Sequence, residues 1–284
     1  MIAYLATSAF GHLYRKIDCT AADIGALRKA IYSRTVSIPL GMHNLEEIVF
    51  ARRASPQAMA AQLRLLLSIS SWRALLKPCG QLLADDLRAF AAGAEPPRPF
   101  LRGAMQNAVT TGISELLESD GEELNEDFAL ALDEVRRERE AFVAGLGEFL
   151  AECGTRFTPP PNAGAFEEYF ARNAPDAAAG LAERAGIGAQ CGGRGAEALL
   201  ALKSARMWVG AALSLACAQS VEGRPSRAEE INEVMHAVTG AAAAETFVTT
   251  DARALSFLGR VAIDGLRTTD LKGFLMQTAQ SLQG

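Results

Sequence analysis

The chain has 284 residues, of which 49% are hydrophobic and 21% are charged, and its formal net charge is −5. This composition is typical of a well-packed globular protein with one elaborated domain or two small ones. Proteins that hold nucleic acid on a broad basic face are usually basic overall, so any contact with nucleic acid should be local here. The five cysteines show no Cys-x-x-Cys spacing, which favours reduced thiols in a cytoplasmic protein over a zinc site or a disulfide framework.

Nothing in the sequence predicts a membrane segment. The N-terminus passes directly into a strand pattern without a basic leader, so we expect no signal peptide. The longest nearly apolar stretch, 207–218, is too short to span a bilayer and predicts a buried helix. We therefore expect a cytoplasmic protein with no membrane partner.

The first fifty residues alternate between strand and helix patterns. This alternation is typical of a parallel sheet with helices on its faces. In chain order, we predict a strand at 2–5, a helix at 21–32 capped by Thr20 or Asp18, a strand at 35–40, and a helix that carries Glu46 and Glu47.

The middle of the chain, 55–204, shows long helical patterns and almost no strand signal. A capping-box pattern at Ser119–Glu122 predicts the start of one helix. The apolar positions of that helix recur at helical spacing, at Phe128, Leu132, Val135, Phe142, Leu146 and Phe149. Arginines interleave with glutamates between them, and we predict that Arg136, Arg137 and Arg139 lie on a solvated outer face.

Strand character returns after residue 226. We predict a helix at 229–242, a strand that ends at Asp251, a helix at 252–258, a strand at 260–263 and a helix at 271–282. The sequence thus predicts an α/β fold with a short parallel sheet, split by a large all-helical insertion. The boundaries are 1–54 for the first half of the core, 55–204 for the insertion and 205–284 for the second half.

Acidic residues follow several of the predicted strands. The carboxyl ends of parallel strands form one edge of the sheet, so Glu46 or Glu47, Glu233 and Asp251 should meet there. Hard cations such as Mg²⁺ take oxygen ligands, and two such ions can hydrolyse a phosphodiester. Each residue alone has a simpler explanation, because helical glutamates are often solvated and Asp251 could only cap the next helix. His236 follows Glu233 by one helical turn, and a lone histidine there is more typical of a packed residue than of a ligand.

Four short segments carry a resemblance to a known family. Tyr4–Phe10 is similar to the opening strand of PIN-domain nucleases, which is followed by Asp-Thr-Ser or Asp-Thr-Asn, and Phe247–Leu255 is similar to their late strand with Val-Thr-x-Asp. Asn232–His236 resembles an Asn-Asp-x-x-His variant, with Glu233 in place of Asp. Asn44–Ile48 matches the place of the family's helical glutamate; Glu47 is favoured, and Glu46 remains open. The resemblance covers 1–54 and 226–270 only.

This resemblance implies a three-layer α/β/α PIN-like fold and a Mg²⁺- or Mn²⁺-dependent endoribonuclease that cuts single-stranded RNA, with DNA as the alternative substrate. It assigns metal binding and catalysis to Glu47 or Glu46, Glu233 and Asp251, and substrate binding to Thr7, Ser8, Asn232, His236 and Arg253. Further candidates for contacts to phosphate are Arg52, Arg53, Arg64, Lys203, Arg206 and Arg260. A homodimer and an inhibitory protein partner are both left open.

Position 6 departs from the family pattern. The family has an aspartate there as a principal metal ligand, and this chain has Ala6. An engineered Asp→Ala replacement and a natural pseudo-nuclease both explain the alanine, and both predict poor cleavage.

Two alternatives to an active nuclease follow. One is a non-catalytic PIN-like module that binds RNA or a protein partner. The other is a phosphatase of the haloacid dehalogenase type, but that class needs Asp-x-Asp after the first strand. The segment Ala6-Thr7-Ser8 would not supply this pair even with aspartate at position 6.

Overall fold

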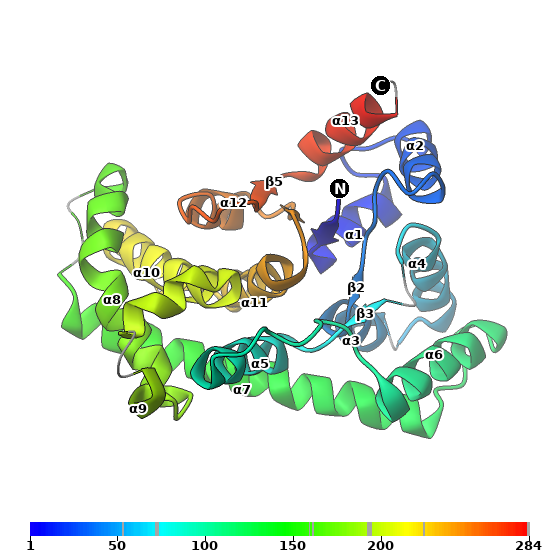
Figure 1. Cartoon of the computed structure of the whole chain (residues 1–284). Coiled ribbons are helices and arrows are strands. Elements are labelled where there is room, and N and C mark those ends of the chain that lie inside the picture. The colour runs from blue at the N-terminus through cyan, green and yellow to red at the C-terminus, as the bar shows by residue number, and fades with distance from the viewer. Residues whose placement is uncertain are drawn as a thin grey trace.

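The computed structural model describes residues 1–52, 54–71, 74–158, 160, 162–191, 195–223 and 225–282, apart from the side chains of Arg52, Ala163 and Glu222. Its strands are short and lie at the centre of a largely helical molecule (Figure 1). They are β1 (Ala3–Leu5), β2 (Leu40–Gly41), β3 (Leu75–Leu76), β4 (Thr246–Val248) and β5 (Arg267–Thr269).

All strand pairs among the described residues are parallel. One sheet has the order β1-β4-β5, and β2 pairs with β3. A parallel bridge between Ile2 and Ser37 joins the two sheets, and Ala3 N donates to Ser37 O over 2.9 Å. The combined order is therefore β3-β2-β1-β4-β5. From β1 the chain adds β2 and then β3 on one side, and it later adds β4 and β5 on the other side of β1. The strand order therefore reverses between β1 and β4, and α/β proteins commonly bind ligands at such a switch point.

The sheet separates two hydrophobic cores. Side chains alternate between the faces of a strand, so Leu5 and Val248 enter one core while Tyr4 and Phe247 enter the other. The first core also takes residues from α1 (Thr7–Arg15), α2 (Ala21–Tyr32), α3 (Met42–Arg52), α4 (Pro56–Ser68), α6 (Gly103–Glu118) and α13 (Leu271–Ser281). The second takes residues from α5 (Cys79–Ala92), α8 (Phe166–Arg184), α9 (Gly188–Cys191), α10 (Lys203–Glu222), α11 (Ala228–Ala243) and α12 (Ala252–Leu258).

One helix, α7 (Glu126–Arg156), contributes to both cores. Its first part buries Phe128 and Val135 in the first core, and its last part buries Leu146 and Cys153 in the second. In Figure 1 it runs along the bottom of the view, beneath α3, α5 and α6. The helical middle of the chain therefore packs against both halves of the α/β core.

Several predicted elements are confirmed. The helix at 21–32 is α2, and Thr20 forms a complete capping box with Asp23. The helix at 252–258 is α12, and the predicted helices at 229–242 and 271–282 correspond to α11 and α13. The first strand and the strand before Asp251 are β1 and β4. The stretch 207–218 lies in α10 and is mostly buried, and no described helix is long and apolar enough to cross a membrane.

Two predicted strands differ from the structure. Residues 260–263 form no strand: Val261 N donates to Leu258 O in a turn, and the Val261 side chain packs on Gly210 of α10. The last strand is β5, a few residues later. The strand predicted at 35–40 is reduced to the bridge at Ser37 and the two residues of β2.

Two predictions for the middle of the chain are wrong. The region 55–204 is not all helical, because it supplies β3 to the sheet. Ser119 does not start a helix but ends α6, since Asp120 and Gly121 adopt φ values of 56° and 90° that stop the helix. The long helix begins later, where the Asn125 side chain accepts a hydrogen bond from Phe128 N.

Candidate carboxylate cleft at the sheet edge

A cleft of about 580 Å³ opens beside the carboxyl ends of β1 and β4. Its walls come from α1, α3, α4, α7, α11 and the start of α12, which include segments far apart in the sequence. Eight residues predicted for the site line it: Thr7, Ser8, Glu46, Glu47, Asn232, Glu233, His236 and Asp251. The prediction that acidic residues from both ends of the chain gather at this edge is thus confirmed as a matter of position.

Hydroxyl groups join the ends of β1 and β4. The Ser8 Oγ lies 3.3 Å from the Thr249 Oγ1 and accepts a hydrogen bond from Thr250 N over 3.4 Å. These contacts hold the first turn of α1 against the loop that leads to Asp251. They place Ser8 at the switch point of the sheet.

An asparagine fixes α3 to the end of β1. The Asn44 Nδ2 donates to Leu5 O over 3.2 Å and contacts Thr7 Oγ1 over 3.1 Å, while its Oδ1 accepts from Gly41 N. Residue 41 must be small, because a Cβ there would lie 2.6 Å from the Tyr4 hydroxyl. This arrangement sets the rotation of α3 and directs Glu47 toward α11.

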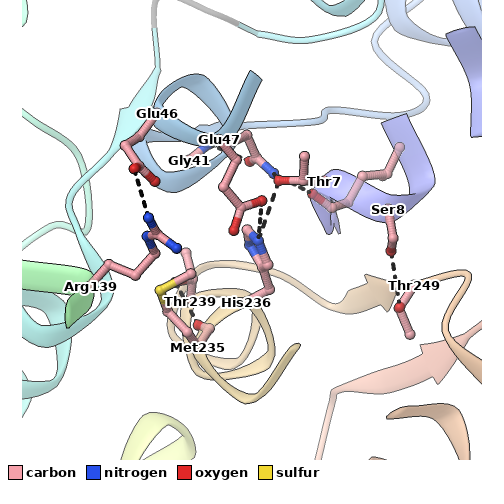
Figure 2. Close-up of polar contacts among 12 residues, drawn as sticks. Thr7, Ser8, Gly41, Glu46, Glu47, Arg139, Met235, His236, Thr239 and Thr249 are labelled. Atoms are coloured by element: carbon pink, nitrogen blue, oxygen red, sulfur yellow. Dashed lines mark hydrogen bonds and ion pairs between the residues drawn. The ribbon is translucent and has the colours of Figure 1, made fainter. Parts of the chain in front are cut away.

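A chain of polar contacts runs from β1 through α11 to α3. The Tyr4 hydroxyl lies 2.8 Å from His236 Nδ1. On the other side of the ring, His236 Nε2 lies 3.3 Å from both Glu47 Oε2 and Thr7 Oγ1 (Figure 2). His236 is buried, and 18% of the Glu47 side chain is exposed. His236 is thus packed and hydrogen-bonded, as its isolated place on the helix predicted, and it also lines the cleft beside a predicted metal ligand.

Burial and pairing shift the pKa values of Glu47 and His236 in opposite directions. Burial alone would raise the pKa of Glu47, but the charge of His236 and hydrogen bonds from His236 and Thr7 lower it to about 2. Burial alone would lower the pKa of His236, but Glu47 and the other nearby carboxylates raise it. The two groups therefore form an ion pair at mildly acidic pH.

Glu233 has a different environment on the opposite wall. Its side chain is buried, and its Oε2 has no hydrogen-bond partner among the described residues. Burial raises its pKa, although His236 and the hydroxyls of Thr249 and Ser8 lower it in part. An unpaired buried carboxylate oxygen is costly unless another group binds it.

Asp251 both caps a helix and lines the cleft. Its Oδ1 accepts hydrogen bonds from Arg253 N and Ala254 N, each over 2.8 Å, which is the geometry of an N-cap for α12. Both of these bonds use Oδ1, so the cap does not require Oδ2. The simpler explanation, capping, is confirmed, and it is compatible with a second role for the other oxygen.

Glu46 and Glu47 are separated by the structure. Glu46 is completely buried, and its Oε1 accepts a hydrogen bond from Arg139 Nη2 of α7 over 3.0 Å. Burial raises the pKa of Glu46, and Arg139 opposes this shift. Of the two alternatives for the helical glutamate, Glu47 is the one beside His236, and Glu46 is the one engaged by an arginine.

Some predicted residues lie elsewhere. Arg253 lines a separate small cavity, where its Nη1 lies 3.4 Å from Glu230 Oε1. Ala6 is fully buried at the N-cap of α1 and makes no side-chain capping bond. Arg64 pairs with Asp120, and Arg206 donates to Ala262 O, both outside the cleft. Arg53 and the side chain of Arg52 lie outside the described residues.

Three charged residues of the cleft were missed or misplaced from sequence. Arg139 was predicted to be solvated, but it lines the cleft, and Arg15 and Glu229 line it as well. The spacing of Arg139 could have revealed it. Arg139 lies four residues after Val135 and three before Phe142, at a position where the helical period of α7 calls for a buried apolar residue. Arg15 and Glu229 carry no comparable signal.

Comparison with other proteins adds no assignment. The chain matches no protein-family model, no curated protein and no solved structure at a significant level.

The carboxylates do not form a ready-made metal centre in this arrangement. Among the described residues, no group of three or more His, Cys, Asp or Glu side chains is disposed to hold a metal ion. Glu47 is engaged by His236, and Asp251 uses one oxygen in its cap. What the cleft offers a cation is the unpartnered oxygen of Glu233 and the oxygen of Asp251 that the cap leaves unused.

Proposed function

We propose that the chain is a PIN-like, metal-dependent endoribonuclease for single-stranded RNA that cleaves poorly as written. The observation that carries the proposal is the meeting of Glu47, Glu233 and Asp251 in one cleft at the switch point of a parallel sheet. These carboxylates come from both ends of the chain, and their convergence is what cation-assisted phosphodiester chemistry requires.

The donor set fits Mg²⁺ or Mn²⁺, which prefer oxygen ligands. Glu233 and Asp251 would hold the ion, because each has a carboxylate oxygen that makes no hydrogen bond to the described residues. Glu47 would join them or orient bound water. When bound, such an ion lowers the pKa of a water molecule and stabilises charge on the leaving oxygen.

The chain's own residues supply binding and orientation. His236 keeps Glu47 ionised and fixes its direction. The Ser8 and Thr7 hydroxyls and the Asn232 amide lie along the cleft, where they can donate hydrogen bonds to phosphate oxygens. Asp251 is held rigidly by its two backbone contacts, so its position changes little when a ligand enters.

Ala6 explains the low activity that we expect. It occupies the end of β1, where Ala6 N donates to Val248 O and the chain turns into α1. An aspartate at this N-cap would add a further carboxylate near the carboxyl ends of β1 and β4. Its absence leaves the cation with fewer protein ligands.

The decisive experiment compares Ala6→Asp with Ala6→Asn. Both side chains suit an N-cap, so they affect α1 alike, but only aspartate adds a charged ligand. We expect Ala6→Asp to raise Mn²⁺-dependent cleavage of a single-stranded oligoribonucleotide by more than about tenfold, since even outer partners of metal ligands have effects of that size. Ala6→Asn should remain at the level of the unchanged chain.

The alanine also favours a second candidate, a non-catalytic PIN-like module that binds RNA or a protein partner. In that case Ala6→Asp binds Mn²⁺ in calorimetry but gains no cleavage. If neither Ala6→Asp nor the unchanged chain binds Mn²⁺, the metal-dependent proposal is wrong.

A further inference from the structure

Arg139 reaches the carboxylate cleft from a part of the chain that resembles no nuclease. It belongs to α7, and its position falls within the stripe of apolar residues that this helix buries. Figure 2 shows its guanidinium directed toward Glu46 on α3, beside Glu47 and His236. Only 24% of the Arg139 side chain is exposed.

The ion pair of Arg139 is incomplete. One nitrogen contacts one oxygen of Glu46, while the Arg139 Nε and the Glu46 Oε2 are both buried and have no hydrogen-bond partner in the part of the chain that the structure describes. A guanidinium carries several N–H donors in a fixed plane and binds carboxylate or phosphate best through two of them. A pair selected only to lock α7 onto α3 would be expected to satisfy both groups.

The position of Arg139 suits an anionic ligand. The cleft contains the acidic side chains of Glu46, Glu47, Glu229, Glu233 and Asp251. These charges repel a polyanion, so a single strand requires a cation at the same place to bring a phosphate close to them. Among the described residues that line the cleft, the arginines are Arg139 and the exposed Arg15, and Arg139 is the one held beside the carboxylates.

We propose that Arg139 binds a backbone phosphate of the single strand next to the carboxylates, and that Glu46 is a positioning residue that holds Arg139 in place. This inference rests on the proposed function and names the residue that recognises its substrate. Under this proposal Glu46, one of the predicted metal ligands, instead positions Arg139.

The test measures binding of a short fluorescent oligouridylate to the unchanged chain, which should consume little of it, over a range of salt concentrations. Replacing Arg139→Gln should weaken binding about tenfold, as expected for one charge-assisted hydrogen-bond pair. It should also reduce the slope of log affinity against log salt by about 0.7, the value for one phosphate contact on a single strand. An oligodeoxythymidylate, measured in parallel, distinguishes RNA from DNA as the source of the phosphate.

Two further variants keep the test decisive. Arg137→Gln removes the same charge from an exposed position on the same helix and should leave affinity and slope nearly unchanged. The double replacement Glu46→Gln with Arg139→Gln avoids a buried unpaired carboxylate and should show the same loss as Arg139→Gln, with normal folding by circular dichroism.

The outcomes are separable. If the unchanged chain binds oligouridylate and Arg139→Gln keeps the same affinity and salt slope, Arg139 does not contact phosphate and this inference is overturned, while the proposed function stands. If the unchanged chain binds neither oligonucleotide, the proposed function fails and this inference fails with it.

Discussion

The carboxylates on the two walls of the cleft differ in whether they have a cationic partner. On the α3 and α7 wall, each glutamate has a cationic partner: Glu46 has Arg139, and Glu47 has His236. On the α11 and α12 wall, Glu233 keeps a buried oxygen that has no hydrogen-bond partner among the residues that the structure describes. The first wall therefore neutralises its carboxylates within the protein, and the second wall is the one where we propose that a cation binds.

The largest effect on stability should come from removing the cationic partner of Glu47. Replacing His236→Gln leaves the Glu47 carboxylate without its charged partner, and we expect the free energy of unfolding to fall by about 3 kcal/mol. Urea denaturation measures this loss. The double replacement with Glu47→Gln should cost less than His236→Gln alone, and equal losses would show that the pair is not coupled.

The same pair makes this loss depend on pH. The Glu47 contribution is present above its ordinary pKa of 4.5 and is lost as the pH falls toward about 2. The His236 contribution is present below its ordinary pKa of 6.5 and is lost as the pH rises through its raised value. The cost of His236→Gln should therefore be greatest between pH 4.5 and 6.5 and smaller on both sides.

A smaller effect is expected at Asp251, where capping and charge can be separated. Asp251→Ala should lower the free energy of unfolding by about 1 kcal/mol, because α12 loses its N-cap. Asp251→Asn retains an oxygen for the cap and should change stability little. If Asp251 also binds a cation, Asp251→Asn should weaken Mn²⁺ binding in calorimetry despite its normal stability.

The smallest effect should have the opposite sign. Glu233→Gln removes a buried carboxylate whose pKa is raised, so we expect stability at pH 8 to increase slightly, by less than about 1 kcal/mol. Near pH 4 the parent carboxyl is protonated and the gain should vanish. A loss of stability at pH 8 would mean that Glu233 is paired after all, and the contrast between the walls would disappear.

The sequence predicted the position of the site better than its internal contacts. Strand patterns and the spacing of Glu47, Glu233 and Asp251 were sufficient to place these residues at one sheet edge, because parallel strands end on the same side. The partners of these residues could not be predicted. His236 and Glu47 are far apart in the sequence, and so are Asn44 and Leu5, whose hydrogen bond fixes α3 to the end of β1.

The misplaced elements have related causes. The two residues of β3 are too few to give an alternating pattern, so only pairing with β2 reveals them. Val261 and Ile263 are apolar because they pack near α10, not because they belong to a strand. Arg139 was assigned to the surface by its charge, although its spacing placed it on the buried face of α7.

Because α7 packs in both hydrophobic cores, the middle of the chain cannot be removed as a separate domain. The helix α7 supplies side chains to the cores on both faces of the sheet. The strand β3, at one edge of the sheet, comes from the same middle segment of the chain. Cutting out 55–204 and joining the flanking pieces would remove a sheet neighbour and expose both interiors to water. The terminal pieces therefore depend on the middle segment to fold, and truncated versions should aggregate rather than yield a smaller folded domain.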